Sequence, residues 1–352
     1  MSPDHPPVVG RWRPRRNWGP RVHEITYAGM RAVVLENERL RVTVLADKGA
    51  DVVEFNDKRR DLDYVWLSPI GLRNPADVAG GGTDDVATFV DSYEGGWQEI
   101  FPSGGAPSTY RGVKLAQHDE VAGLAWDYAI VADGESEVAV TFTVHGRRMP
   151  FRVSRTLRLG AGEPALEVRE ETVNDAPVDL PAMWGQHVVF GRPFLRPGCR
   201  ITLPDGANVI PHPDAINPPH RLVAPGGPWR WPEVPGPDGG TVDLSLVGAR
   251  GEPSDIVYLT GFTEGWYEVR DPGSGTGLRV AWDARVLPYL WRWQELGASE
   301  GYPWWGRIYT VGLEPFSSYP TNGLAEAVAN GSALNYPAGE RKSLEWSITL
   351  LG

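Results

Sequence analysis

Apolar and polar residues alternate with a period of two along much of this 352-residue chain. The alternation is clearest at residues 138–144 and 344–350, where Val, Phe, Trp, Ile and Leu occupy every second position. Successive side chains of a strand point to opposite faces, so this pattern predicts strands with one buried face. Helical periodicity is almost absent, and only residues 323–330 are expected to form one or two helical turns. The sequence therefore predicts an all-β fold of the antiparallel sandwich or barrel type.

Composition narrows the classes of protein that this chain can belong to. The formal net charge of −11 argues against a nucleic-acid partner, and it disfavours a phosphorylated substrate unless arginines gather locally. No run reaches the roughly 18 apolar residues of a membrane span, and residues 1–20 lack the apolar stretch of a signal peptide. The single cysteine, Cys199, has no partner within the chain and suits a reducing compartment. We expect a cytoplasmic protein.

One segment departs from the strand pattern. Residues 211–240 contain nine prolines and five glycines, which is typical either of a linker between domains or of a long loop. Trp229 and Trp231 favour an ordered loop, because a mobile linker would expose their apolar surface. We expect a single domain over residues 33–352 that includes this loop, and an N-terminal extension over residues 1–32 that packs on the domain.

Two side chains that can carry protons stand in strand-like runs. His187 follows Trp184-Gly185-Gln186 within an apolar segment, and Glu314 follows Leu313 and precedes a proline. Imidazole has a pKa of about 6.5, so it can donate or accept a proton near neutral pH. Glutamate is a poor strand former, and it is expected at a strand end only where it faces water or a site. A core histidine and a solvated carboxylate remain the alternatives.

Further candidates could bind a polar ligand. His118 lies between Gln117 and two acids, where it is either solvated or a second imidazole of the site. Trp97 could stack on a sugar ring, while Gln98 and Glu99 could hydrogen-bond its hydroxyl groups. The alternative for this segment is a turn that enters a strand whose tryptophan is in the core. Trp293 shares one side of a predicted strand with Trp291, and it is either core or the wall of a site.

Cofactor and metal motifs are missing from the sequence. It contains no phosphate-binding loop, dinucleotide fingerprint or nucleophile elbow, so we expect no cofactor. His212 and His220 lie in the proline-rich segment without cysteines or helical spacing, so we expect no metal site there.

Eight segments, taken in chain order, resemble the galactose mutarotase (aldose 1-epimerase) superfamily. They are the hairpin 39–55, Trp66-Leu67-Ser68-Pro69, the Gly-Gly-Trp-x-Glu-x-Phe-Pro segment at 95–102, His118 before Trp126, Glu171-Thr172-Val173-Asn174, Trp184-Gly185-Gln186-His187, Leu313-Glu314-Pro315 and Pro337-Ala338-Gly339-Glu340. The resemblance runs from about residue 33 to the C-terminus. It implies a large antiparallel β-supersandwich with few short helices, in agreement with the period-two pattern.

The resemblance also implies roles for particular residues. Glu314 matches the family's catalytic base, His187 its catalytic acid, and His118 its supporting histidine. The implied reaction interconverts the α and β anomers of a free sugar or sugar derivative, by proton transfers that open and close the ring without a cofactor. The implied partner is therefore a monosaccharide or a sugar derivative.

The chain departs from the family at two sugar-binding positions. Where typical members carry a sugar-binding arginine, this chain has Gly96-Trp97-Gln98-Glu99, and the usual aspartate has only Asp205 and Glu264 as candidates. These departures indicate a divergent branch, and they keep a non-catalytic carbohydrate-binding module open as an alternative. A hexose-6-phosphate epimerase would need a basic pocket, for which the available arginines are Arg111, Arg292 and Arg307. Another isomerase or lyase on the same scaffold is the remaining alternative.

Overall fold

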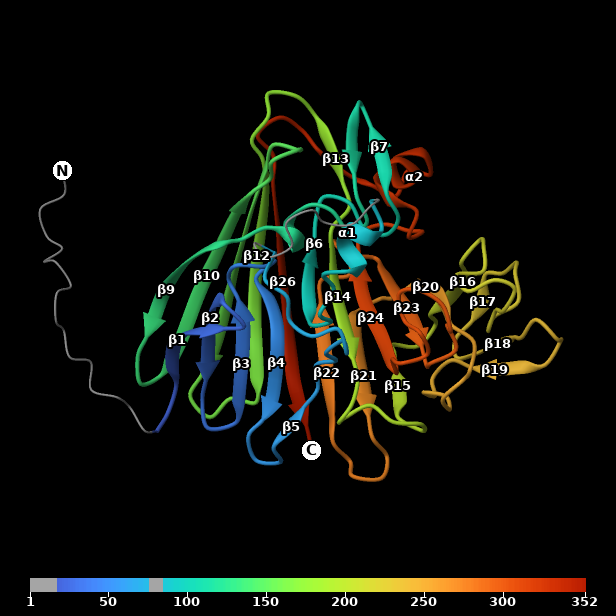
Figure 1. Ribbon diagram of the computed structural model, residues 1–352, viewed down its shortest axis with the longest axis horizontal. Coiled ribbons are helices and arrows are strands. Elements are labelled where there is room, and N and C mark those ends of the chain that lie inside the picture. The colour runs from blue at the N-terminus through green and yellow to red at the C-terminus, as the bar shows by residue number, and fades with distance from the viewer. Residues whose placement is uncertain (1–17, 76–84) are drawn as a thin grey trace, which may run out of the picture.

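The computed structural model describes residues 18–75 and 85–352, and most strands of this part form two large antiparallel sheets (Figure 1). The all-β fold predicted from the period-two alternation is confirmed. The sheets lie face to face, and both contribute side chains to a shared interior, as in other β-sandwiches.

The larger sheet has twelve strands and carries the candidate site. In order across the sheet, its strands are β1 (Arg21–Tyr27), β2 (Met30–Glu36), β3 (Leu40–Leu45), β4 (Asp51–Asp57), β6 (Trp97–Ile100), β14 (Gly185–Phe190), β24 (Thr310–Phe316), β23 (Tyr289–Glu295), β20 (Asp255–Thr260), β16 (Asn208–Pro211) and β17 (Trp229–Arg230), with β5 (Leu62–Asp63) paired to β4. Strands distant in the sequence, such as β6, β14 and β24, are neighbours at its centre.

The second sheet has eight strands. In order, they are β15 (Arg200–Thr202), β21 (Gly265–Arg270), β22 (Gly277–Trp282), β26 (Arg341–Leu351), β12 (Ala165–Asn174), β11 (Phe151–Gly160), β10 (Glu137–His145) and β9 (Asp127–Asp133). The runs 138–144 and 344–350 fall within β10 and β26, and their apolar residues are buried.

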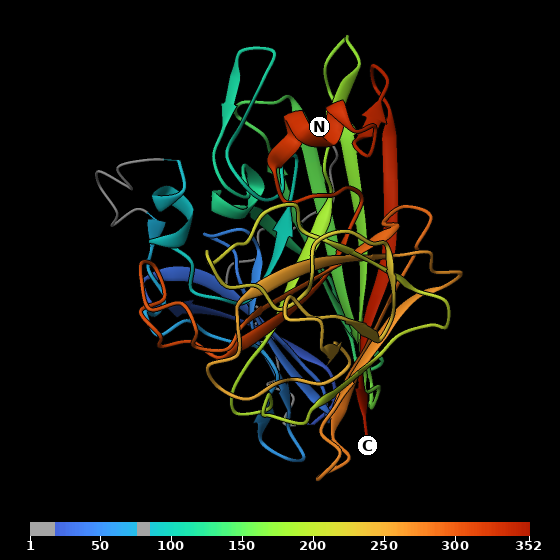
Figure 2. The same cartoon turned by 90° about the vertical axis from the view of Figure 1, so that its right-hand side faces the viewer.

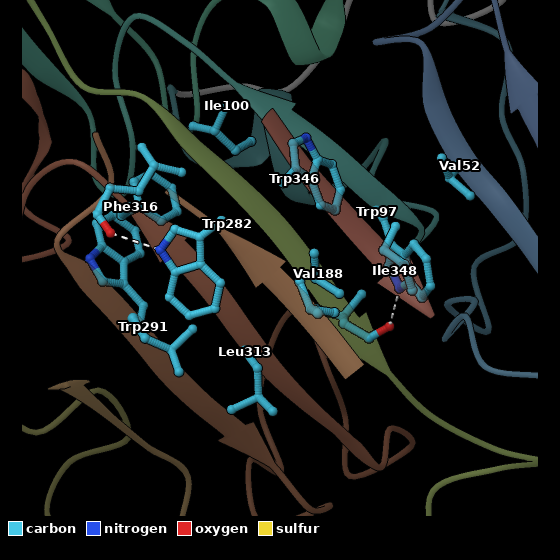
Figure 3. Packing of buried hydrophobic residues seen from close by; sticks show 14 of the residues in the cluster. Val52, Trp97, Ile100, Val188, Trp282, Trp291, Leu313, Phe316, Trp346 and Ile348 are labelled. Carbon is cyan, nitrogen blue, oxygen red and sulfur yellow. Dashed lines mark hydrogen bonds between the residues drawn. The ribbon is translucent and has the colours of Figure 1, made fainter. Parts of the chain in front are cut away.

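The interior between the sheets is filled by large apolar side chains (Figure 3). Trp97, Val188 and Leu313 come from the larger sheet, while Trp282 and Trp346 come from the second sheet. All five are at least nine-tenths buried, so this layer holds the central strands in place.

Short elements cover the ends of the sandwich. The three small two-stranded sheets pair β7 (Ser108–Tyr110) with β8 (Val113–Leu115), β13 (Leu180–Ala182) with β25 (Leu334–Tyr336), and β18 (Glu233–Pro235) with β19 (Thr241–Asp243). The short helices are α1 (Ala87–Val90), the 3₁₀ turn Val121–Gly123 and α2 (Gly323–Ala329). Helix α2 confirms the helical turns expected at residues 323–330.

The proline-rich segment is an ordered loop rather than a linker. Residues 211–240 run along the right-hand edge of the molecule in Figure 1 and lie nearest the viewer in Figure 2. Within this segment, Val223 and Val234 are at most 1% exposed and belong to the main core. Trp229 and Trp231 are half-buried against the same core.

The expected N-terminal boundary divides a strand. β1 and β2 are paired strands of the larger sheet, so residues 21–32 are part of the sheet rather than an extension packed on it. Residues 1–17 of the expected extension lie outside the described residues.

Candidate active site

Three adjacent strands bring the two predicted proton-carrying residues together. β14 and β24 pair antiparallel, and their register sets Gly185 against Phe316 and Val189 against Gly312. This register places His187 of β14 directly opposite Glu314 of β24. On the other side of β24, Trp291 of β23 is the partner of Glu314. One row across the sheet therefore carries an imidazole, a carboxyl group and an indole.

This row faces away from the second sheet. Gln186 donates a 2.7 Å hydrogen bond to Glu170 of β12, so it points between the sheets. Because side chains alternate along a strand, His187 points to the opposite, outer face. Glu314 alternates in the same way with Leu313, which packs between the sheets (Figure 3). The two residues thus meet on the outer face, beneath the loops that cover it.

His187 and Glu314 are close without being hydrogen-bonded to each other. The imidazole Nε2 lies 3.6 Å from the Glu314 Oε1, and the residues are 5% and 2% exposed. Gly312 makes room for this arrangement, because a β-carbon at that position would overlap the Glu314 carboxyl group. The spacing leaves both groups able to bond to a ligand between or above them.

Burial favours the uncharged forms of both groups. Burial raises the pKa of Glu314 well above its ordinary value, because the carboxylate is removed from water. Burial, and then the neighbouring His118, lower the pKa of His187 well below its ordinary value. Both shifts favour the uncharged forms, a protonated carboxyl group on Glu314 and a neutral imidazole on His187.

Two further groups surround the His187 ring. The Tyr93 hydroxyl lies 3.4 Å from His187 Nδ1, and the oxygen and nitrogen form a hydrogen bond. Burial raises the pKa of Tyr93 well above its ordinary value, so the phenol keeps its proton. A phenol that donates to Nδ1 leaves the imidazole proton on Nε2, the nitrogen that faces Glu314.

His118 stands on the other side of the same imidazole. Its ring centre is 5.2 Å from that of His187, at an angle of 71°. The backbone N–H of Gly105 donates to His118 Nδ1 at 3.2 Å, which places the proton of the neutral ring on Nε2. Burial lowers the pKa of His118 to about 4, so the ring is neutral at physiological pH.

These residues open into a cavity of about 410 Å³, within the size range of small-molecule sites. Its walls are mainly aromatic and apolar, with a few amide, hydroxyl and imidazole groups. They are formed by Val86, Phe89, Val90, Tyr93, Gly105, Ala106, Gln117, His118, His187, His212, Ile216, Ile256, Trp291, Trp293, Pro303, Trp304, Glu314, Thr321 and Asn322. Of these, Glu314 is the one carboxylic acid that lines the cavity in the described part of the chain.

A second hydrogen-bonded group lines the cavity near Trp291. His212 Nδ1 lies 2.5 Å from the Tyr258 hydroxyl, which in turn accepts a hydrogen bond from the Thr321 backbone N–H at 2.9 Å. Burial lowers the pKa of His212, so its ring is neutral. Within the described residues, His212 Nε2 has no hydrogen-bond partner, which leaves it available to a ligand.

Trp97 and Glu99 lie away from this cavity, contrary to their expected role in substrate binding. They are partners of Val188 and Gln186 across β6 and β14, so both face the interior between the sheets. The Trp97 indole donates to the Val189 carbonyl at 2.9 Å and packs in the core.

Gln98 and Arg111 do not line the cavity either. Gln98 is on the same face as His187, but it is 1% exposed and its amide donates to Asp51 at 2.9 Å. Arg111 lies at the tip of the β7–β8 hairpin, exposed, over the Tyr110 ring. Of the five expected substrate-binding residues, Trp293 is thus the one that the structure places at the cavity wall.

The other candidates for sugar or phosphate binding also lie elsewhere. Asp205 and Glu264 are exposed and do not line the cavity. Arg292 is buried, donates to the Leu244 carbonyl and contacts Gln294. Arg307 lines a separate hollow. Among the described residues, no arginine or lysine lines the cavity that holds His187 and Glu314.

Sequence reasoning missed several cavity residues. Tyr93, Phe89 and Trp304 come from loops and the short helix α1, whose positions above a sheet leave no periodic signal. His212 was considered only as a metal ligand, and among the described residues no group of three or more His, Cys, Asp or Glu could hold a metal. No helix in the described ranges is long and apolar enough to cross a membrane.

Comparison with solved structures identifies the class of fold. A "putative aldose 1-epimerase" from Klebsiella pneumoniae superposes with a TM-score of 0.74 at 14% identity, covering 95% of this chain and 88% of its own. A "putative mutarotase" from Salmonella typhimurium gives 0.62 at 13% identity, covering 98% and 96%. A galactose mutarotase-like protein from Lactobacillus casei gives 0.57 at 17% identity, covering 91% and 99%. The fold is that of the galactose mutarotase-like superfamily.

The family within this class is shown by the sequence. Residues 27–241 match the model of a domain of unknown function, DUF4432, and the chain belongs to that family. No curated protein matches the chain. A mutarotase-like fold in a family described as a domain of unknown function is consistent with the expected divergent branch.

Proposed function

We propose that this protein is an aldose 1-epimerase that interconverts the α and β anomers of a free, uncharged sugar, with Glu314 as base and His187 as acid. The observation that carries the proposal is the cross-strand pair itself, a buried carboxyl group and an imidazole 3.6 Å apart in an aromatic cavity. The reaction needs an acid and a base close together, because the anomeric hydroxyl and the ring oxygen are attached to the same carbon.

The proton held by the pair is sufficient for the reaction. The reactive form is the ion pair, with Glu314 as a carboxylate and His187 as an imidazolium, and it carries the same number of protons as the neutral pair. Glu314 then takes the proton of the anomeric hydroxyl, C1–O1 becomes a carbonyl and the C1–O5 bond breaks. O5 takes the proton from His187, the open chain rotates about C1–C2, and closure by the reverse steps gives the other anomer. No cofactor is consumed, and the reverse steps return both groups to their starting protonation states.

The walls of the cavity support a sugar as the ligand. Trp291 and Trp293 flank the acid–base pair, and indole rings pack well against the C–H face of a pyranose. His212 Nε2, Gln117 and Asn322 supply polar groups for hydroxyls. Since no cationic side chain lines the cavity in the described residues, an uncharged sugar fits better than a phosphorylated one.

Anomer-exchange NMR on a panel of neutral monosaccharides tests the proposal. We expect the purified protein to accelerate exchange of at least one sugar, with Glu314→Gln and His187→Ala reduced to the uncatalysed rate. Exposed residues provide matched controls, because Glu345→Gln and His145→Ala make the same chemical changes far from the cavity. Exchange that is unaffected by Glu314→Gln and His187→Ala would contradict the proposal.

A non-catalytic sugar-binding module is the second candidate. It is favoured by the lack of a cationic sugar-binding side chain at the described cavity wall. Saturable binding of a monosaccharide, without accelerated exchange for any sugar of the panel, would establish this alternative.

A further inference from the structure

Three arginines gather at one end of the larger sheet, around a hollow of about 490 Å³ that is separate from the active-site cavity. Arg192 follows β14 by two residues, and Arg307 precedes β24 by three. Because β14 and β24 are antiparallel neighbours, the end of one strand lies beside the start of the other. Arg250 comes from the loop before β20 and completes the group.

The loop that carries Arg250 is held in place. The Arg250 guanidinium donates to the Gly306 carbonyl and packs against the backbone at Gly297. The Tyr309 hydroxyl donates to the Gly248 carbonyl at 2.6 Å, which ties the same loop to the start of β24. Much of the ordering needed to bind a ligand is therefore already present in the folded protein.

The positive charge of this group is not neutralised locally. None of the three arginines forms an ion pair with a carboxylate in the described residues, and no acidic residue lines the hollow. Most other arginines on the surface behave differently, as Arg158, Arg196 and Arg279 each contact a carboxylate. The hollow therefore gathers three unpaired guanidinium groups in a chain with a net charge of −11.

The remaining walls of the hollow are apolar. They include Trp66, Leu67, Pro69 and Ile308, and Leu67 is 38% exposed. The hollow thus combines a positively charged end with an apolar surface, and its volume exceeds that of a single phosphate ion.

We propose that this hollow binds a phosphorylated small molecule. The phosphate lies among the guanidinium groups of Arg192, Arg250 and Arg307, and the organic part packs against Leu67 and Trp66. A phosphate dianion has three terminal oxygens that accept paired N–H donors, which guanidinium forks match in geometry and charge. The aromatic contacts of Trp66 with Tyr93 and Trp304 separate this hollow from the active-site cavity.

Calorimetric titration and ³¹P NMR test the site directly. The probes are inorganic phosphate, glucose 6-phosphate and adenosine monophosphate, so that a bare ion, a sugar phosphate and a nucleotide are distinguished. We expect an organic phosphate to bind more tightly than inorganic phosphate, and Arg192→Gln/Arg307→Gln to weaken its binding about tenfold or more. Added salt should weaken binding to the wild-type protein.

A charge-matched control separates this site from general attraction of anions. Arg59→Gln/Arg230→Gln removes two exposed arginines that form no ion pair in the described residues, so the change in net charge is the same. Circular dichroism verifies folding, and single Arg307→Gln replaces the double variant if that variant does not fold. The proposal is overturned if no phosphate compound binds, or if the control loses as much affinity. The assay needs no turnover, so its result is independent of the proposed epimerase activity.

Discussion

Two clusters of buried ionisable groups lie on opposite faces of the same central strands, and they differ in how completely their polar atoms are bonded. Between the sheets, Glu99 and Glu170 surround Arg155. On the outer face, Glu314 stands beside His187 in the cavity.

Both carboxyl groups of the inter-sheet cluster accept hydrogen bonds. Glu99 accepts from the Trp184 indole at 2.6 Å and from the Gln186 amide at 2.8 Å. Glu170 accepts from the same amide and from the Trp346 indole at 3.0 Å. By contrast, no residue that the structure describes donates a hydrogen bond to Glu314. Buried acids whose oxygens accept hydrogen bonds suit a packed interior, whereas a buried acid without donors is suited to a ligand that supplies them.

The largest expected effect is on the rate of anomer exchange, in which the two clusters should differ. Glu314→Gln removes the base while keeping the size of the side chain, so we expect the rate of anomer exchange to fall by about 10²–10⁴-fold. Glu99→Gln changes a carboxylate to the same amide between the sheets, and there we expect exchange within about threefold of wild type. NMR exchange rates measure both variants. Equal losses of rate would show that the two acids do not have different roles.

The same two variants should change stability in opposite directions. The folded-state pKa of Glu314 is raised, so the stability that this group contributes is fully present below its unfolded pKa and is lost as pH rises through the folded pKa. At neutral pH the native carboxyl group therefore opposes folding, and Glu314→Gln should raise the melting temperature. Glu99→Gln replaces an acceptor with an amide that cannot accept all the present donors, so its melting temperature should fall. Thermal denaturation at pH 7 measures both shifts.

Removing the cation of the inter-sheet cluster is the next test. Arg155→Met leaves Glu99 and Glu170 without their cation, and removing one partner of a buried ion pair typically costs about 3–5 kcal/mol. We therefore expect a large loss of unfolding free energy in urea, with anomer exchange of the folded fraction close to wild type. Arg169→Met is the control, since its contact with Glu345 is exposed and should contribute about 0–1 kcal/mol. An Arg155→Met protein as stable as this control would contradict a structural role for the cluster.

The comparison also explains what could be predicted from sequence. The alternation along β10 and β26 predicted the fold class, because a strand that buries one face has apolar residues at every second position. His187 and Glu314 were identified through their strand-end motifs and family resemblance, and the register places them together. Trp97 and Glu99 were assigned to the wrong face, since a strand buried on both faces, as β6 is, carries no alternation to tell them apart. Tyr93 and His212 could not be found, because their positions depend on how loops fold over the sheet.

The pH dependence of exchange should report the shared proton of the outer cluster. Activity requires that the pair hold one proton, so it is lost when the pair gains a second proton or loses its only one. The lowered pKa of His187 puts the acid limb below the ordinary histidine value, and the raised pKa of Glu314 puts the alkaline limb above the ordinary carboxyl value. We expect a bell-shaped profile of kcat/KM with these two limbs. An acid limb at or above about 6.5 would contradict a buried, neutral His187.

The smallest expected effect comes from the hydroxyl behind the imidazole. Tyr93→Phe keeps the ring that packs against His187 but removes the 3.4 Å hydrogen bond to Nδ1, which is worth about 0.5–1.5 kcal/mol. The corresponding fall in kcat is about two- to tenfold, with KM nearly unchanged, because Tyr93 orients the acid and does not hold the sugar in this mechanism. Tyr128→Phe, in edge strand β9 of the second sheet, removes a hydroxyl that donates to Glu24 and is the matched control. If Tyr93→Phe instead raised KM at constant kcat, the hydroxyl would belong to sugar binding, and the proton on His187 Nε2 would be placed by the ligand rather than by the protein.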